Sequence, residues 1–167
     1  FALVDVGQSA PASWLLIITA DNEVITYGGA APTLRYSLSP SVTPDTPPTC
    51  ATTATAASPV GTYPITCSGA AKAGYEVTYV SGTLTVNPAP LTIIADNKSM
   101  GLGSTVPLLT ASYFGLVNGD TPAVVGGSVE LATNATASSP VGTYDITFAN
   151  APALPDYTVT TVLGTLT

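Results

Sequence analysis

The sequence predicts a mainly β protein built from two tandem small domains, and three observations lead to this prediction. The 167-residue chain is rich in Thr and contains 15 Gly and 15 Pro, residues that favour strands and turns. Short runs of alternating apolar and polar residues recur along it, which is the pattern of half-buried strands. The same motifs are also written twice, which indicates a repeated structural unit.

The repeat sets the expected domain boundaries. Ala20-Asp21-Asn22 recurs as Ala95-Asp96-Asn97, and residues 58–63 (SPVGTY) recur as residues 139–144. We therefore expect one domain at residues 13–87 and a second at 91–167. Residues 88–90 contain two prolines and are predicted to form a stiff, extended linker. Residues 1–12 are expected to be an N-terminal extended segment or the end of an upstream unit.

Alternating apolar residues locate the strands in order along the chain. The outward-facing Pro64 predicts an edge position for its strand. Ser81-Gly82 is predicted to form either a tight hairpin turn or a bulge. The predicted strands lie at residues 16–20, 63–67, 75–79, 84–86, 91–95 and 144–148.

One short helix is predicted, and it lies in the second repeat. Within residues 118–125, Asp120 or Thr121 can cap a single turn that has Pro122 at its first position. The first repeat lacks most of the residues that would continue such a turn.

The two cysteines stand at equal distances on either side of the turn at residues 58–61. In an antiparallel hairpin, Cys50 and Cys67 would therefore face each other. In the second repeat, Leu131 and Phe148 hold the matching positions as an apolar pair. We expect a disulfide and hence an oxidising compartment, with two buried free thiols as the alternative.

Charge and composition disfavour several functions. Lys and Arg total three against ten Asp and Glu, which gives a net charge of −7. So few cations argue against nucleic acid or an anionic membrane as a partner. The apolar run at residues 14–20 is too short to span a membrane, so no membrane insertion is expected within this segment.

The absence of His disfavours enzymatic activity, because Ser and Thr nucleophiles then lack their usual base. The acids that recur in both repeats are interpreted as turn or capping residues rather than catalysts. We therefore expect no enzyme, no catalytic residues, no cofactor and no metal site. Calcium is the one ion that the oxygen-bearing side chains could bind, through Asp21, Asn22, Asp96, Asn97 or Asp120.

The aromatic residues fall into two groups. Four tyrosines recur in phase with apolar neighbours and are predicted to lie in the core: Tyr63, Tyr75, Tyr144 and Tyr157. The less regular aromatics form either a patch that binds sugar or protein, or isolated surface residues: Trp14, Tyr27, Tyr36 and Tyr113.

Three motifs of the second repeat carry a family resemblance: residues 91–98 (LTIIADNK), 114–121 (FGLVNGDT) and 139–146 (SPVGTYDI). They resemble the MBG domains of bacterial extracellular proteins, and the likeness covers both repeats. It implies β-grasp-like modules with at most one short helix each, strung in tandem in adhesins and surface proteins; an immunoglobulin-like β-sandwich is the alternative fold. The first repeat departs from the pattern at residues 39–44 (SPSVTP).

The leading functional hypothesis is a non-catalytic spacer or stalk of an extracellular, repeat-containing surface or adhesion protein. Tandem β-units joined by Pro-rich links form a semi-rigid stalk. The expected partners are neighbouring repeats or copies of the chain itself.

Two alternatives remain open. The mean hydropathy of +0.41 indicates a sticky surface, as in a subunit of an extracellular filament assembled by strand exchange through residues 1–9. The possible assembly strand consists of Phe1, Leu3, Val4 and Val6. The other alternative is a carbohydrate- or protein-binding module, with surface glycans or proteins as partners.

Overall fold

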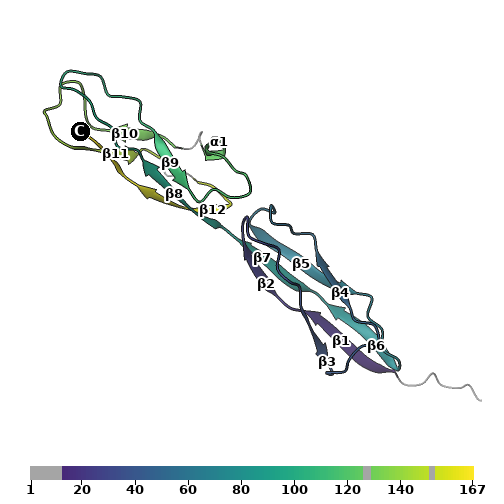
Figure 1. Cartoon of the computed structure of the whole chain (residues 1–167). Coiled ribbons are helices and arrows are strands. Elements are labelled where there is room, and N and C mark those ends of the chain that lie inside the picture. Colours follow the sequence, from purple (N-terminus) through teal and green to yellow (C-terminus); the bar gives the residue numbers. More distant parts are fainter. Residues whose placement is uncertain (1–12, 126–128, 151–152) are drawn as a thin grey trace, which may run out of the picture. The chain divides into compact units, whose positions relative to one another are not determined.

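A computed structural model describes residues 13–125, 129–150 and 153–167, and within them the regular secondary structure consists of strands apart from one short helix (Figure 1). The predicted mainly β class is therefore confirmed. The strands are β1 (Trp14–Ala20), β2 (Glu23–Thr26), β3 (Tyr36–Ser39), β4 (Thr49–Thr52), β5 (Gly61–Ser68), β6 (Tyr75–Val80), β7 (Gly82–Asn87), β8 (Ala89–Ala95), β9 (Ala111–Phe114), β10 (Leu131–Thr133), β11 (Tyr144–Phe148), β12 (Tyr157–Val162) and β13 (Gly164–Leu166), with helix α1 at Pro122–Val125.

Each repeat forms two sheets, and its first strand has the same kinds of strand pairing in both repeats. The first repeat forms the sheets β3-β1-β6 and β2-β7-β5-β4, and the second forms β9-β8-β12 and β10-β11-β13. In each repeat the first strand pairs in parallel with a strand near the end of the repeat: β1 with β6, and β8 with β12. On its other side, the first strand pairs antiparallel with β3 or β9.

The core follows the predicted alternation. Leu16 and Ile18 of β1 are fully buried, and Leu91 and Ile93 of β8 are buried in the same way. Because successive side chains of a strand point to opposite faces, every second residue contributes to the core. In the second repeat, one apolar cluster joins both sheets, and its buried members are Ala95 of β8, Ala135, Ile146 of β11 and Leu166 of β13.

Ser81-Gly82 is the point where the chain passes from one sheet to the other. The strand before it, β6, lies beside β1, whereas β7 lies between β2 and β5. Of the two alternatives, the hairpin is therefore excluded, because β6 and β7 do not pair with each other. A Cβ at Gly82 would lie 2.5 Å from the Ala20 carbonyl oxygen, so the crossing needs a residue without a side chain.

The prolines sit where a neighbouring strand has ended. Contrary to the prediction, β5 is an interior strand, but the pairing of β4 ends with Thr52 opposite Ile65, so Pro64 lies just beyond it. Pro90 is likewise within β8, opposite Thr158, before the pairing with β9 begins at Thr92. In both places the missing N–H costs no bond to that neighbour.

The predicted helix forms as the single turn α1, with Pro122 as its first residue. A proline suits this position because its N–H has no partner within the helix. In the first repeat, Thr46 instead forms a bridge with Ala71, and the residues that follow lead into β4.

By their contacts, the residues form two compact units. The first unit contains residues 13–24, Pro32–Ala54 and Thr62–Thr85. The second unit contains Ile25–Ala31, Thr55–Gly61 and the described residues of Val86–Thr167. Two loops that belong to the first repeat by sequence are therefore part of the second unit by contact.

Candidate functional site

Cys50 of β4 and Cys67 of β5 are directly paired and form the predicted disulfide, with their Cα atoms 4.0 Å apart. Leu131 of β10 and Phe148 of β11 are paired in the same register. One repeat thus holds this position of the hairpin with a covalent bond and the other with an apolar contact. The bond excludes the alternative of two free thiols and fits an oxidising compartment.

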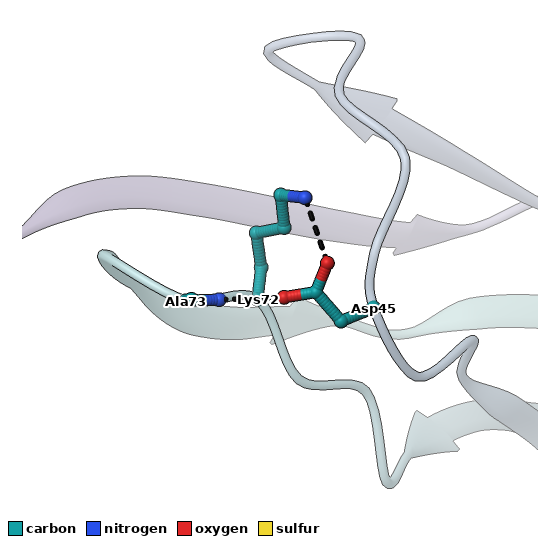
Figure 2. A network of polar contacts seen from close by, with 3 residues as sticks. All are labelled: Asp45, Lys72 and Ala73. Atoms are coloured by element: carbon teal, nitrogen blue, oxygen red, sulfur yellow. Dashed lines mark hydrogen bonds and ion pairs between the residues drawn. The ribbon is translucent and has the colours of Figure 1, made fainter.

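Asp45 ties two segments of the first repeat together (Figure 2). Its Oδ1 lies 2.8 Å from Nζ of Lys72, and its Oδ2 accepts a hydrogen bond from the N–H of Ala73 at 2.9 Å. The hydrogen bond from Lys72, followed by that from Ala73, lowers the pKa of Asp45. Both side chains of the ion pair are well solvated, so the pair contributes little to stability.

Asp96 has a similar role in the second repeat. Its carboxylate accepts hydrogen bonds from Oγ1 of Thr110 at 2.5 Å and from Oγ of Ser112 at 2.7 Å. These bonds, with that from Ser112 the stronger influence, lower the pKa of Asp96. The carboxylate thus holds the start of β9 beside the end of β8.

The two repeated asparagines make the same contact in both repeats. Asn22 accepts a hydrogen bond from the N–H of Thr83 at 2.8 Å, and Asn97 accepts one from the N–H of Thr165 at 2.8 Å. The two residues of each pair are 61 and 68 positions apart in the sequence, respectively. Together with Asp45 and Asp96, they connect separate segments of the chain, whereas the sequence predicts local turns and caps for the two acids.

Asp120 accepts hydrogen bonds from two tyrosines in the second unit. The hydroxyl of Tyr157 donates to Oδ2 at 2.6 Å, and that of Tyr27 donates to the same oxygen at 3.3 Å. The two rings meet edge to face with centroids 5.5 Å apart. Burial, followed by the hydrogen bond to Asp120, raises the pKa of Tyr157 to about 12.

The sequence interpretation missed Tyr27, which it grouped with the irregular aromatics. Gly28 follows it with a φ of 74°, a backbone conformation that most residues disfavour, but the Tyr-Gly pair by itself does not indicate the contact with Asp120. Tyr157, by contrast, is buried as predicted. Its hydroxyl also contacts the backbone of Val117, accepting from the N–H at 3.2 Å.

The remaining aromatics do not form one patch with Tyr27. Tyr27 and Tyr113 both pack against the apolar cluster that contains Leu91 and Ile93. Trp14, at the start of β1, is 73% exposed. Tyr36 pairs with Ala20 at the opposite end of the same strand. Of the two alternatives for these aromatics, a single patch of all four is therefore excluded, and Trp14 is an exposed surface residue.

No metal-binding cluster is found within residues 13–125, 129–150 and 153–167: nowhere there do three or more His, Cys, Asp or Glu gather as ligands. The same residues contain no helix with the length and apolar character to cross a membrane. The possible assembly strand of Phe1, Leu3, Val4 and Val6 lies outside the described residues. Calcium binding and the absence of catalysis stay predictions.

Two copies of one small β architecture, whose recurring polar residues join strands to loops, define a tandem-repeat module. The model of the MBG domain family (YGX type) matches residues 16–85 and 91–167, and the chain belongs to this family. MBG domains are repeat modules of surface and adhesin-type proteins, typically extracellular ones. No curated protein matches the chain. The Tyr-Gly pair occurs in the chain only at Tyr27-Gly28, and Leu102-Gly103 holds the equivalent place in the second repeat.

Proposed function

We propose that the chain is a non-catalytic structural spacer, a stalk segment of an extracellular surface or adhesion protein. The observation that carries this proposal is the parallel pairing of the first strand of each repeat with the strand that leads toward its exit. Six residue pairs join β1 to β6, from Trp14↔Tyr75 to Thr19↔Val80. Another six join β8 to β12.

Parallel pairing suits a segment under tension. Tension between the two ends of a repeat pulls the beginning of β1 and the end of β6 in opposite directions along the strands. The hydrogen bonds of the pair run across the strands, so this force shears all of them together rather than opening them one at a time. A repeat built in this way resists extension more strongly than one that opens by unzipping.

The proposal is tested by single-molecule force spectroscopy on the full chain. We expect each repeat to unfold in its own step when the chain is pulled from its termini. The step of the first repeat should grow by about 6 nm after reduction, because the disulfide withholds a 17-residue span from extension.

A matched control changes only the direction of pulling. Handles at positions 14 and 75 attach to paired residues at the same end of β1 and β6. Force applied there opens the pair bond by bond, so the first repeat should unfold at a several-fold lower force. Equal forces in the two geometries would contradict the proposed role.

A filament subunit is the second candidate, and two edge strands favour it. β6 and β12 end their sheets and carry exposed apolar residues at Val80 and Val162. Such an edge accepts a strand from another chain. Deletion of residues 1–9 should then abolish assembly, whereas fibres formed by the shortened chain would dismiss this candidate.

The proposed partners are accordingly neighbouring repeats or copies of the chain, with no nucleic acid and no membrane. A carbohydrate- or protein-binding role has less support, since Tyr36 lies at the opposite end of β1 from the exposed Trp14, while Tyr27 and Tyr113 pack against an apolar cluster. Binding on a glycan array that is lost in W14A would favour this role over the spacer.

A further inference from the structure

Two loops of the first repeat, Ile25–Ala31 and Thr55–Gly61, are covered within the second unit. The N–H of Val60 donates a hydrogen bond to Oδ1 of Asp156 at 2.7 Å. This charge-assisted bond gives the second loop a specific partner on the second repeat.

Two further contacts complete the cover. Nδ2 of Asn118 donates to the carbonyl of Ala56 at 3.1 Å. Gly28 lies against Val117 so closely that a Cβ at Gly28 would be 2.5 Å from the Val117 side chain. We refer to Val117, Asn118 and Asp156 as the covering surface.

The second repeat contains the same pair of loops, at residues 100–106 and 136–142, which we call the terminal loops. In both repeats the N–H of the turn's Thr donates to Oγ of the Ser three residues later at 2.8 Å. Gly103 has a φ of 82°, close to the 74° of its equivalent Gly28. The terminal loops thus share these two turn features with the covered loops.

Their apolar side chains are uncovered. Leu102 is 74% exposed and Val141 is 89% exposed, and both line a pocket of about 60 Å³ together with Tyr144 and Leu166. A pocket of this size is far smaller than the several hundred Å³ typical of small-molecule sites. An apolar surface of this kind is more suited to contact with another folded module.

The chemistry of the covering surface identifies the module that would fit. The first repeat lacks the polar residues of the covering surface, because Thr43 and Gly74 occupy the positions of Asn118 and Asp156. In a separate copy of the chain, the covering surface of the second repeat already contacts its own loops. The fitting occupant is therefore a module of the second-repeat type that directly follows the terminal loops.

We propose that the terminal loops are a docking surface for a following MBG module that carries an Asn and an Asp at the positions of Asn118 and Asp156. The proposal rests on the proposed function, since a spacer needs defined contacts between successive modules. Leu102 replaces Tyr27 in this contact, so the docking is more apolar and lacks the hydroxyl bond that Tyr27 makes to Asp120.

The test extends the full chain with a second copy of residues 86–167 joined after Thr167, which keeps the spacing of the repeats. Amide hydrogen exchange of Val141 is then compared by NMR between the original and extended chains. We expect its exchange to slow by about tenfold to a hundredfold, because the N–H gains the carboxylate partner that Val60 has. L102Y should slow it further by restoring the aromatic residue of the first repeat.

The control variant carries N118T and D156G in the added copy only, which gives it the first repeat's residues at both positions. Val141 should then exchange as in the original chain while core amides of the added copy stay protected. Unchanged exchange beside a folded, unmodified added copy would overturn the proposal. So would an added copy that fails to fold, since the same sequence folds after the first repeat. The two proposals fail independently. If Val141 is protected from exchange but the first repeat unfolds at equal force in both pulling geometries, only the spacer function is overturned.

Discussion

Loss of the Cys50–Cys67 disulfide should destabilise the first repeat by about 3 kcal/mol. The bond closes a 17-residue span, and the loop-closure relation gives an entropy of roughly 10 cal/mol/K for a loop of that length, or about 3 kcal/mol at 25 °C. In a domain of this size, such a change lowers the melting temperature by roughly 12–24 °C.

Two double variants separate loop closure from packing. C50A/C67A removes both the bond and most of the side-chain contact. C50L/C67F removes the bond but installs the pair that the second repeat has at the matching register, Leu131 and Phe148. We expect C50L/C67F to be more stable than C50A/C67A by about 1–2 kcal/mol, because apolar burial is restored.

Native-state hydrogen exchange measures each repeat within the same molecule. The amides of Ile65 in β5 and Ile146 in β11 belong to fully buried residues and report on the first and second repeats. The variants should accelerate exchange at Ile65 and leave Ile146 nearly unchanged. A loss below about 1 kcal/mol at Ile65, or an equal loss at both amides, would refute the loop-closure reasoning.

Three other predictions concern single residues. Y157F removes the hydrogen bond to Asp120 and should lower the free energy of unfolding by about 1–2 kcal/mol, measured by thermal unfolding. Because the pKa of Tyr157 is raised from 10.0 to about 12 in the folded state, its contribution to stability is present below pH 10 and lost as the pH rises toward 12. Y157F should not show this loss, and a loss that persists in Y157F would exclude this tyrosine as its cause. Because the pKa of Asp45 is lowered in the folded state, its contribution to stability is present above pH 3.8 and lost as the pH falls through the folded pKa. The stability of D45N should therefore fall less on acidification than that of the unsubstituted chain, and identical acid curves would contradict the contact between Asp45 and Lys72. G82A places a Cβ against the Ala20 carbonyl and should lower the free energy of unfolding by about 1–3 kcal/mol, measured by chemical denaturation. In the control G101A, the Cβ would meet only the Ser104 hydroxyl at 3.3 Å, so stability should change by less than about 0.5 kcal/mol. Equal effects of the two substitutions would show that the close approach to Ala20 is not what requires Gly82.

The features that the sequence predicted well are those governed by local periodicity or by the repeat itself. Alternation with a period of two located β1, β8 and β11, because burial of one face imposes that pattern on a strand. The symmetry of Cys50 and Cys67 about their turn predicted their pairing, since the register of a hairpin follows from its turn.

The features that it missed depend on contacts between distant segments. Tyr27 and Asp120 are 93 residues apart, and nothing local to either residue indicates the other. The interior position of β5 depends on β4 and β7 lying on either side of it, which Pro64 alone does not reveal. Local turn chemistry predicts that the recurring acids are caps, but tertiary packing gives Asp45, Asp96 and Asp120 other partners.

The passage of the chain from one sheet to the other at Gly82, repeated at Gly164 against the Ala95 carbonyl, restricts where these modules can change in length. The spacing between matched motifs grows from 75 to 81 residues between positions 47 and 58, but stays at 82 from Val80 through Leu84. One residue inserted between β6 and β7 would reverse the facing of every later side chain of β7 while β6 kept its own register. Length variation among such modules should therefore accumulate in the connecting loops and spare this crossing.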